Sequence, residues 1–479
     1  MDNLLSKSKG FSEEYCCTVV RVGALEDVEN SDNLKKTYIN GESIVVNKND
    51  VKEGDIMLYV SNECQIDSGF LFINNMYEHY ELNANKAEVE EKLKQNADFK
   101  NTDEFKKMRG YFGDNGRVRM IRLRGCPSFG VLLKPTSFEK AYIHSDIKID
   151  WNALVGTDFD TVWNDIIFVK AYVPPMRGNH TKTISQKVSK WDRFDRMVAG
   201  QFKLHYDTEM LKKHLDLFKL DTTIDVTIKI HGTSFICGNL LVNYPKPFYR
   251  LKRLINNVFK TNISEFKQQY GMVVSSRKVI KNEWANTKHK EGYYGVDIWT
   301  EYGNIIYPYI PKGVTVYGEI FGYLTNSSRM IQKDYDYGNA VGANKLMIYR
   351  VTEHTPEGLK EYSISEVIEF TKKIYGNMVA NNDVNADRIF NIEEVKLYHG
   401  KLETLVNNVD DFVDFLVKNC NIEKREPMCN NNVPREGVVV RICDDAVTEA
   451  FKLKGVAFLT REAKNIDGGE VDIEMENNL

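Results

Sequence analysis

Short apolar runs separated by turn residues dominate the N-terminal part of the chain. Runs such as Cys16–Gly23, Ser43–Val46 and Ile56–Val60 are rich in β-branched and aromatic residues, which is typical of short strands. Arg117–Leu133 continues the pattern, but its arginines change from one face to the other. That change indicates a bulge or two short strands. Several short strands in one segment predict a small barrel or sandwich.

The stretch Asn83–Lys107 interrupts this pattern with a helical period. Glu88 and Lys92 form a favourable i, i+4 pair, and Val89 and Leu93 repeat at the same interval. We therefore expect an exposed helical insertion here.

Residues 146–205 are expected to form a connector, because Pro174-Pro175 and the polar stretch Lys182–Lys190 are poor at building a core. Glu209–Leu220 has the period of an amphipathic helix. The remaining pattern predicts strands at Thr227–Ile236, Gly271–Ser275, Val314–Ile320, Leu346–Val351, Gly437–Ile442 and Ala450–Leu453, and helices at Ser365–Tyr375 and Val409–Asn419. Two units joined by a linker fit this order better than one continuous fold.

Composition narrows the class of protein. The 479 residues are 42% hydrophobic and 28% charged, and the net charge is −4. Such a chain buries a core and has no global basic field, so any contact with nucleic acid must come from local patches. The eight cysteines include no C-x-x-C pair, which suits buried thiols in a reducing compartment. No apolar run approaches a membrane span, and the first residues do not read as a secretory signal, so we expect a cytoplasmic protein.

The most informative segment is Ile228-Lys229-Ile230-His231-Gly232. A lysine on an apolar strand, followed by a glycine turn, holds its amine in a confined place. A nucleophilic lysine must be neutral, and its ordinary pKa of about 10.4 has to fall through burial or neighbouring cations. We expect Gly232 to let the backbone approach a nucleotide. Taken alone, a strand lysine with a solvated amine explains the segment better.

Other strands add polar groups of matching chemistry. Arg277 ends one strand and Glu319 lies between two glycines, while Glu436 enters a buried apolar strand. Tyr349 is either a core residue or a stacking surface for a base. Lys452 and Lys454 point to the same side of a strand, where they repel each other unless an anion lies between them. A nucleoside triphosphate with a divalent cation would satisfy all of these groups together.

The order of the motifs Lys-x-His-Gly, Ser-x-Arg, Tyr-Gly-Glu, an aromatic strand, Glu-Gly-Val-Val and Lys-x-Lys resembles that of the covalent nucleotidyltransferases, the polynucleotide ligases and mRNA capping enzymes. His231 in the third position is similar to the RNA-ligase branch. The segments Gly113–Val118, Ile121–Gly125, Ser128–Val131 and Phe202–Thr208 resemble bacterial nick-sealing RNA ligases with an N-terminal OB-like domain.

This resemblance implies an α+β fold. We expect an OB-like β-barrel at residues 1–145, with the insertion at 83–107, and the connector at 146–205. A nucleotidyltransferase domain of antiparallel sheets with flanking helices would then occupy residues 206–479. Only 25 residues follow Lys454, too few for an OB domain at that end, which argues against a capping enzyme.

The resemblance also implies a reaction. Lys229 would attack the α-phosphate of ATP, expel pyrophosphate and carry AMP, while Lys452 and Lys454 would bind the α-phosphate. AMP would then pass to a 5′-phosphate, and a neighbouring 3′-OH would attack to expel it.

The remaining groups would hold the nucleotide and the metal, Mg²⁺ or Mn²⁺. Glu436 would bind the catalytic metal, Glu319 and Arg277 would contact the ribose and the metal shell, and Tyr349 would stack on adenine. The motif around the lysine adds the nucleotide-binding positions Ile228, Ile230, His231 and Gly232. Ile228 stands where some relatives place an adenine-reading glutamate, so base selectivity would rest on backbone groups.

The expected partner is RNA, as a nicked duplex or a broken strand, and a role in RNA repair follows. Arg117, Arg119, Arg122 and Arg124 would line a phosphate-tracking groove on the barrel, or lie on solvated faces. The alternatives are a DNA or mixed RNA–DNA nick ligase, and an inactive nucleic-acid-binding relative. The insertions at 83–107 and 355–430 argue against transferring a substrate preference from relatives. No membrane partner is expected, and the sequence names no protein partner.

Overall fold

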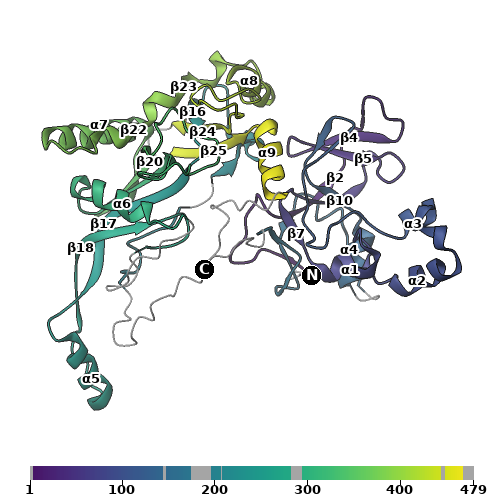
Figure 1. Ribbon diagram of the computed structural model, residues 1–479, viewed down its shortest axis with the longest axis horizontal. Coiled ribbons are helices and arrows are strands. Elements are labelled where there is room, and N and C mark those ends of the chain that lie inside the picture. The colour runs from purple at the N-terminus through teal and green to yellow at the C-terminus, as the bar shows by residue number, and fades with distance from the viewer. Residues whose placement is uncertain are drawn as a thin grey trace. The chain divides into compact units, whose positions relative to one another are not determined.

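The computed structural model describes residues 4–143, 147–173, 196–205, 208–281, 294–443 and 448–467. The chain divides into two compact units. Unit 1 comprises residues 1–174 and 459–468, and unit 2 comprises residues 175–458 and 469–479 (Figure 1). Both mix strands with helices, which confirms the expected α+β class. Of the predicted connector, Pro174-Pro175 and Lys182–Lys190 lie outside the described residues.

Unit 1 is built from short strands around one core. Strands β10, β6, β2 and β11 form a four-stranded sheet, and β3, β4 and β5 form a three-stranded meander. The elements are β1 (Leu5–Ser6), β2 (Cys17–Arg21), β3 (Glu26–Asp27), β4 (Leu34–Ile39), β5 (Glu42–Asn47), β6 (Ile56–Val60), β7 (Cys64–Ile66), β8 (Ile121–Leu123), β9 (Cys126–Ser128), β10 (Val131–Leu133), β11 (Asp158–Phe159), β12 (Thr161–Val162), β13 (Ile166–Ile167), β14 (Val169–Ala171), α1 (Ser68–Ile73), α2 (Lys86–Gln95), α3 (Asp103–Lys107) and α4 (Pro135–Tyr142).

The core of unit 1 explains this arrangement. Alternate residues of β2 and β6, such as Val19 and Leu58, are fully buried and pack with Phe138 of α4 and Phe168. The predicted helical insertion is present as α2 and α3, and the i, i+4 pair joins Lys92 Nζ to Glu88 Oε1 at 3.5 Å. Strands β8, β9 and β10 confirm that the arginine-rich segment is not one flat strand.

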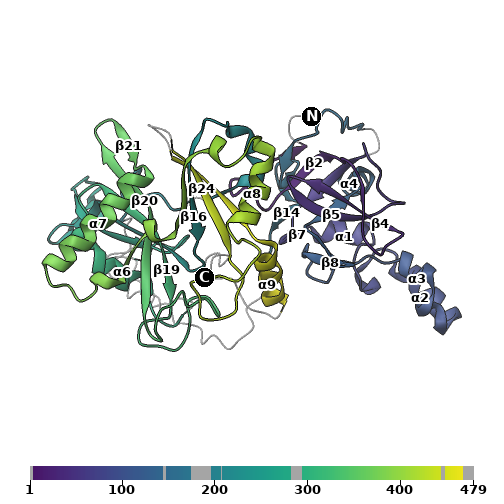
Figure 2. The ribbon, with the colours of Figure 1, turned by 90° about the horizontal axis from the view of Figure 1, so that it is seen from above.

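Unit 2 is built on two mainly antiparallel sheets, which lie side by side in Figure 2. Helix α7 packs along β20 of the second sheet. One sheet has the order β15-β25-β24-β16-β23, and the other has the order β18-β17-β19-β20-β21 with β22 beside β20. The elements are β15 (Glu209–Met210), β16 (Thr223–Lys229), β17 (Thr233–Pro245), β18 (Phe266–Ser275), β19 (Val314–Gly322), β20 (Asn344–Thr355), β21 (Gly358–Glu361), β22 (Ile389–Asn391), β23 (Lys396–Lys401), β24 (Gly437–Cys443), β25 (Thr448–Lys454), α5 (Tyr249–Phe259), α6 (Ile298–Ile306), α7 (Ile364–Ala380) and α8 (Phe412–Asn419).

Helix α9 (Val456–Asp467) follows β25. Its first backbone amides are capped by a side chain, because Glu423 accepts hydrogen bonds from the N–H groups of Val456 and Ala457 at 2.7 and 3.0 Å. None of the helices in the described ranges is long and apolar enough to cross a membrane.

Two predicted elements of unit 2 are wrong in detail. Glu209–Leu220 is not an α-helix but the short strand β15 followed by two 3₁₀ turns. Met210 pairs in parallel with Lys452 of β25, and Leu211 and Phe218 still enter the core beneath the sheet. The periodicity therefore predicted correctly which residues are buried, but pairing with the sheet determined the conformation of the backbone. The single strand expected at Thr227–Ile236 is two strands, β16 and β17, joined by a three-residue link.

The long segment after β20 is part of the architecture of unit 2. Strand β23 pairs with β16 and completes the edge of the first sheet. Helix α7 begins at a capping box in which Ser363 and Glu366 each bond the other's backbone, and it packs along β20 and β22. Residues 355–430 therefore support both sheets of unit 2, with β23 at the edge of the sheet that carries Lys229.

Candidate active site

Lys229 lies at the point where the two sheets of unit 2 are joined. It is the last residue of β16, and residues 230–232 lead directly into β17 of the other sheet. In the first sheet Lys229 is opposite Gly437 of β24, and Gly437 is opposite Lys454 of β25. Strand register alone therefore places Lys229, Gly437 and Lys454 in one row, next to the residue that precedes Gly437.

That preceding residue is Glu436, which is the centre of a charge cluster. Its Oε1 atom lies 2.8 Å from Lys229 Nζ and 3.8 Å from Lys454 Nζ. The Glu436 side chain is only 2% exposed, and each lysine side chain is 20% exposed. Two ammonium groups therefore lie within 4 Å of one carboxylate, and cations gathered in one place favour an anionic ligand beside them.

The position of Glu436 is fixed by its neighbour in the sequence. Arg435 is buried and pairs with buried Glu426, with Nε donating to Oε2 at 2.8 Å. Its Nη1 also donates to the carbonyl oxygen of Cys420 at 2.7 Å. A guanidinium held by several bonds anchors the chain at the entrance of β24, so the carboxylate of Glu436 is presented in one place.

The second oxygen of Glu436 suits a divalent cation. Oε2 is buried and accepts no hydrogen bond from any described residue, and Nδ1 of His231 lies 3.6 Å away. A buried carboxylate oxygen without a donor is costly unless a cation completes its surroundings. Hard divalent cations prefer such oxygen ligands, so Glu436 fits the metal role that the sequence predicted.

Glu319 is held against the link between the sheets. Its Oε1 atom accepts a hydrogen bond from the N–H of Gly232 at 3.1 Å, and Gln332 Nε2 donates to the Gly232 carbonyl at 2.7 Å. A Cβ atom at Gly232 would lie 2.3 Å from the carbonyl oxygen of Ile320. Glycine is therefore required here by the close passage of β19, a steric reason within the protein that differs from the expected approach of a nucleotide.

The ring of His231 packs between two aromatic residues. Its centroid is 4.9 Å from that of Tyr335 and 5.0 Å from that of Phe458, both edge-on. The N–H of His231 donates to the hydroxyl of Tyr337 at 2.7 Å. Burial and the charge of Glu436 raise the pKa of Tyr337 well above its ordinary value, so this hydroxyl stays neutral.

Lys452, the other lysine expected to bind the α-phosphate, lies on the same face of the first sheet as Lys229. Lys452 lies opposite Val439 of β24, which lies opposite Thr227 of β16. Because side chains alternate along strands, Lys452 and Lys454 share the face of Lys229. Lys452 is buried, with 8% of its surface exposed.

Tyr349 lies at an irregularity of the second sheet. Tyr317 is paired with Arg350 and Gly318 with Ile348, so Tyr349 is the extra residue of a β-bulge. Its ring is 5.6 Å from that of His205, a residue of the predicted motif before the catalytic strand. Bulges redirect a side chain, which explains why Tyr349 is only half-buried although it lies in a central strand.

The other predicted nucleotide-binding positions take different places. Arg277 follows the end of β18 by two residues, at the same edge of the sheet as Glu319, and it is half-buried. Ile228 and Ile230 are buried, so they shape the apolar surroundings of Lys229.

The four arginines expected on the barrel do not share one environment. Arg117 is buried, with its Nε 2.7 Å from Oε2 of Glu63 and its Nη1 2.7 Å from Oδ1 of Asp467. Its guanidinium is paired with carboxylates inside unit 1, so it does not line a solvent-facing groove. Arg119, Arg122 and Arg124 are exposed.

Three neighbours of the cluster, Gln332, Tyr335 and Tyr337, were not predicted from the sequence. They lie in the connection between β19 and β20, which has no strand or helix period. All three are at most 9% exposed. The tyrosine-rich run Tyr335-Asp336-Tyr337 was the available signal, since a polar-tipped aromatic in a connection needs a buried partner.

Comparisons with known proteins address the fold. Residues 16–100 match a family described as an OB-fold domain, and no curated protein matches the chain. Among solved structures, Naegleria gruberi RNA ligase with PPi is 14% identical, with a TM-score of 0.52 over 95% of this chain and 100% of that chain. A variant of that ligase with ATP and Mn is 15% identical, with a TM-score of 0.51 over 95% and 100% of the two chains. Another variant, with AMP and Mn, is 14% identical, with a TM-score of 0.51 over 93% and 98%. The chain thus has the α+β fold of an RNA ligase with an N-terminal OB-fold domain.

Proposed function

We propose that the protein is an ATP-dependent RNA ligase that seals 3′-OH and 5′-phosphate ends through a lysyl-AMP intermediate. The observation that carries this proposal is the cluster at Glu436, where one buried carboxylate faces Lys229 and Lys454 within 4 Å. The likeness of the fold to RNA ligase structures that contain ATP, AMP or PPi supports it.

In the first step, the neutral amine of Lys229 attacks the α-phosphorus of ATP. A P–N bond forms, the bond to the bridging oxygen of the β-phosphate breaks, and pyrophosphate leaves. Lys454 and Lys452 lie on the same face of the sheet and offset the charge that develops on the α-phosphate. The amine has to lose its proton first, and Oε1 of Glu436 lies 2.8 Å from it.

Glu436 and Glu319 are the proposed metal ligands. Both carboxylates are buried and lie beside the link between the sheets, Glu436 against Lys229 and Glu319 against the N–H of Gly232. Mg²⁺ or Mn²⁺ bound there would neutralise phosphate charge and compete with Lys229 for Glu436.

Adenosine is proposed to lie between the two sheets, with Tyr349 stacking on the base and Arg277 near the ribose. His231 and Gly232 act through the backbone link that they form, and buried Ile228 and Ile230 exclude water around it.

In the later steps, AMP moves from Lys229 to the 5′-phosphate of RNA, and a 3′-OH then expels AMP as the phosphodiester bond forms. Exposed Arg119, Arg122 and Arg124 of unit 1 are the proposed contacts to the RNA backbone. In-line positioning supplies much of the rate, as in other phosphoryl transfers.

The first step can be tested by covalent labelling. Purified protein is incubated with ATP labelled at the α-phosphate and Mg²⁺ or Mn²⁺, denatured, and examined for retained label. Wild-type protein and a Lys401→Ala control, whose lysine is exposed on β23 of the same sheet, should carry label, and Lys229→Ala should not. Folded protein that carries neither label nor prior AMP would favour an inactive nucleic-acid-binding relative.

The substrate is tested separately with nicked duplexes in which the strand with the 3′-OH is RNA or DNA. We expect sealing to require RNA at that end. Equal sealing of DNA would favour the alternative, a DNA or mixed nick ligase, because discrimination depends on sensing the 2′-OH.

A further inference from the structure

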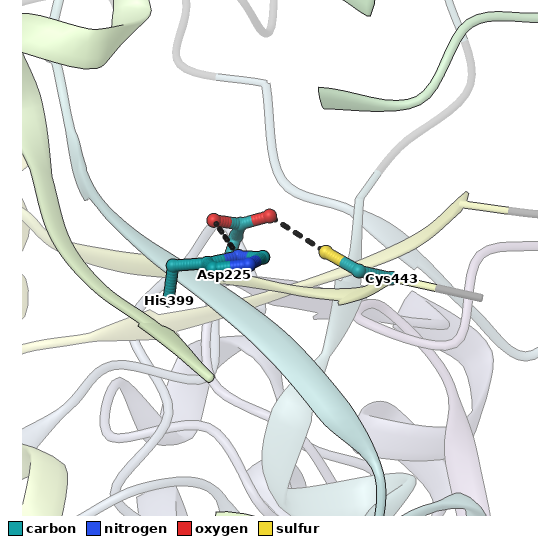
Figure 3. Close-up of side chains that lie close together, drawn as sticks. All are labelled: Asp225, His399 and Cys443. Atoms are coloured by element: carbon teal, nitrogen blue, oxygen red, sulfur yellow. Dashed lines mark hydrogen bonds and ion pairs between the residues drawn. The ribbon is translucent and has the colours of Figure 1, made fainter. Parts of the chain in front are cut away.

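A cluster of side chains of the types that ligate metals lies on the first sheet of unit 2. Figure 3 shows Asp225, His399 and Cys443 converging from three neighbouring strands, β16, β23 and β24. Nδ1 of His399 lies 3.0 Å from Oδ1 of Asp225, and Sγ of Cys443 lies 2.6 Å from Oδ2 of Asp225. The ligand atoms of all three residues lie within 4.8 Å of one another.

Strand register creates this convergence. Asp225 is opposite His399 on one side and Arg441 on the other, and Cys443 follows Arg441 by two residues, so it points to the same face. Asp225 precedes Lys229 by four residues on β16, which places the two about 13 Å apart along the strand. The cluster is therefore separate from the carboxylates proposed to hold the catalytic metal.

The donor set is that of a borderline-soft divalent cation. Thiolate, imidazole and carboxylate are the three ligand types that zinc takes in proteins, and donors at this separation can share one ion. Asp225 is fully buried, whereas the side chain of His399 is 54% exposed. One side of the cluster is thus open to solvent, which gives an ion an entry path and a water as its fourth ligand.

Without an ion, the same three residues form a hydrogen-bonded triad. The thiol of Cys443 donates to Asp225, and burial together with that carboxylate raises the pKa of the thiol to about 12. Arg441 is buried beside them, but its Nη1 atom donates to Thr227 at 2.9 Å. An ion would take the place of the thiol proton, so its binding releases one proton per thiolate formed.

We propose that Asp225, His399 and Cys443 bind one Zn²⁺-like cation that ties edge strand β23 to β16 and β24. The site is structural: it holds the far end of the strand that carries Lys229. Strand β23 pairs with the sheet along one side through β16, and a metal bond adds a second tie to that edge.

The test uses the metal alone on the full chain. Metal-free protein is loaded with Co²⁺, and we expect a thiolate-to-cobalt absorption band that one equivalent of Zn²⁺ removes. Zinc content after gel filtration should be one per chain in wild type and in a Cys126→Ser control, a partly exposed thiol of unit 1. Cys443→Ser and His399→Ala should each weaken zinc binding at least 100-fold.

His399→Ala keeps the test decisive if Cys443→Ser fails to fold, because His399 is half-exposed on an edge strand. Absence of a cobalt–thiolate band in folded wild-type protein, or zinc content that is unchanged in both variants, would establish the hydrogen-bonded triad and overturn the proposal.

An independent feature of unit 2 is the ribbon that carries α5. Strands β17 and β18 pair from Ile236 and Ser275 out to Pro245 and Phe266, but β19 accompanies β17 only as far as Gly238. Beyond that point the two strands continue as a ribbon with α5 at its tip (Figure 1).

The tip exposes a large apolar stripe. Leu251, Leu254 and Val258 follow one another at the spacing of a helix face and are 55%, 45% and 61% exposed. Phe248 and Phe259 at the helix ends are 79% and 71% exposed. Helix α5 contains no buried residue, so its stripe has no place in the core of unit 2.

The same tip is strongly basic in a chain of net charge −4. Its single acidic residue is Glu265, which pairs with Arg253 at 2.9 Å. The basic residues from Tyr244 to Lys267 are Lys246, Arg250, Lys252, Arg253, Lys260 and Lys267.

Exposed aromatic rings among cations favour a single-stranded nucleic acid, because bases stack on the rings while the cations pair with phosphates. We infer that the tip of this ribbon binds an RNA strand. This inference rests on the proposed function, since it assigns an RNA contact to the ligase.

The test separates RNA binding by the ribbon tip from the proposed ligase activity. Charge reversal at Arg250→Glu with Lys252→Glu should weaken binding of a single-stranded RNA at least tenfold and reduce its salt dependence. Labelling by ATP should stay within twofold of wild type. Lys418→Glu, at an exposed position of α8, is the matched control and should bind RNA like wild type. Unchanged RNA affinity in the double variant would overturn the inference. Loss of self-association of the chain without loss of RNA affinity would also overturn it.

Discussion

Nζ of Lys229 and Oε1 of Glu436 lie 2.8 Å apart, and the pairing of β16 with β24 determines that distance. Lys229 is the last residue of β16 and is paired with Gly437 of β24. Glu436 directly precedes Gly437. A slip of one residue in this register would turn Lys229 to the opposite face of the sheet. The apolar residues on that opposite face, such as Val226 and Val440, are fully buried and so prevent the slip.

Replacing Glu436 by glutamine should abolish most activity. Glu436→Gln keeps the shape of the side chain but leaves the ammonium groups of Lys229 and Lys454 without their shared carboxylate. Loss of a charged group that acts in the reaction costs on the order of 100-fold in rate, or about 2.7 kcal/mol. Single-turnover labelling with ATP and Mn²⁺ measures it. Glu449→Gln, at an exposed position of β25, should match wild type, and a labelling rate for Glu436→Gln within threefold of wild type would contradict the assigned role.

Gly232→Ala should destabilise unit 2 and slow labelling together. The added Cβ would lie 2.3 Å from the Ile320 carbonyl oxygen and 2.9 Å from Cγ of Glu319. Overpacking of this kind costs about 1–3 kcal/mol, and it moves Glu319. Gly376→Ala is the control, because nothing lies within 4 Å of a Cβ there and alanine should stabilise α7 by about 0.5–1 kcal/mol. Urea denaturation measures both; equal stability of the two variants would contradict the steric argument.

The sequence predicted the strands of unit 2 because their apolar runs are long and their motifs lie at strand ends. Lys229, Glu436 and Lys454 were identified from their motifs, and their meeting follows from strand pairing. The pairing itself was not predictable from the spacing along the chain, since β16 and β24 are far apart in sequence.

Other features depend on tertiary contacts that leave no local pattern. Glu209–Leu220 has a helical period, but pairing of Met210 with Lys452 competes with the helix and prevails. In the sequence, Arg117 resembles its exposed neighbours. In the fold, its guanidinium is buried against Glu63, the residue that precedes β7. Tyr337 and Gln332 lie in an aperiodic connection, so their contacts to residues 231 and 232 appear only in the fold.

Arg117→Met should destabilise unit 1. The pair with Glu63 is buried, with side chains 3% and 9% exposed. Removing one partner leaves an uncompensated buried charge, which costs about 3–5 kcal/mol. Thermal or urea denaturation measures the loss. The double variant Arg117→Met with Glu63→Met should recover much of it, and Arg119→Met, at an exposed position, should stay within about 0.5 kcal/mol of wild type. A double variant less stable than Arg117→Met alone would contradict the role of the pair.

Tyr337→Phe should weaken the fold by an amount that does not depend on pH near neutrality. The variant leaves the part-buried N–H of His231 without the hydroxyl that accepts its hydrogen bond, which costs about 1–3 kcal/mol. Burial and Glu436 raise the pKa of Tyr337 well above its ordinary value. The contribution of a group with a raised pKa is complete below its unfolded value of about 10 and is lost only as the pH rises beyond it.

The free energy of unfolding of both proteins, measured in urea at about pH 6, 7.5 and 9, should therefore differ by a constant amount, since all three lie below the unfolded pKa of tyrosine. Tyr375→Phe, at a tyrosine of α7 that is 42% exposed, should change stability by less than about 0.5 kcal/mol. A difference for Tyr337→Phe that shrinks between about pH 6 and 9 would mean that the hydroxyl titrates in this range, and that its environment is more exposed to solvent than the contacts with His231 imply.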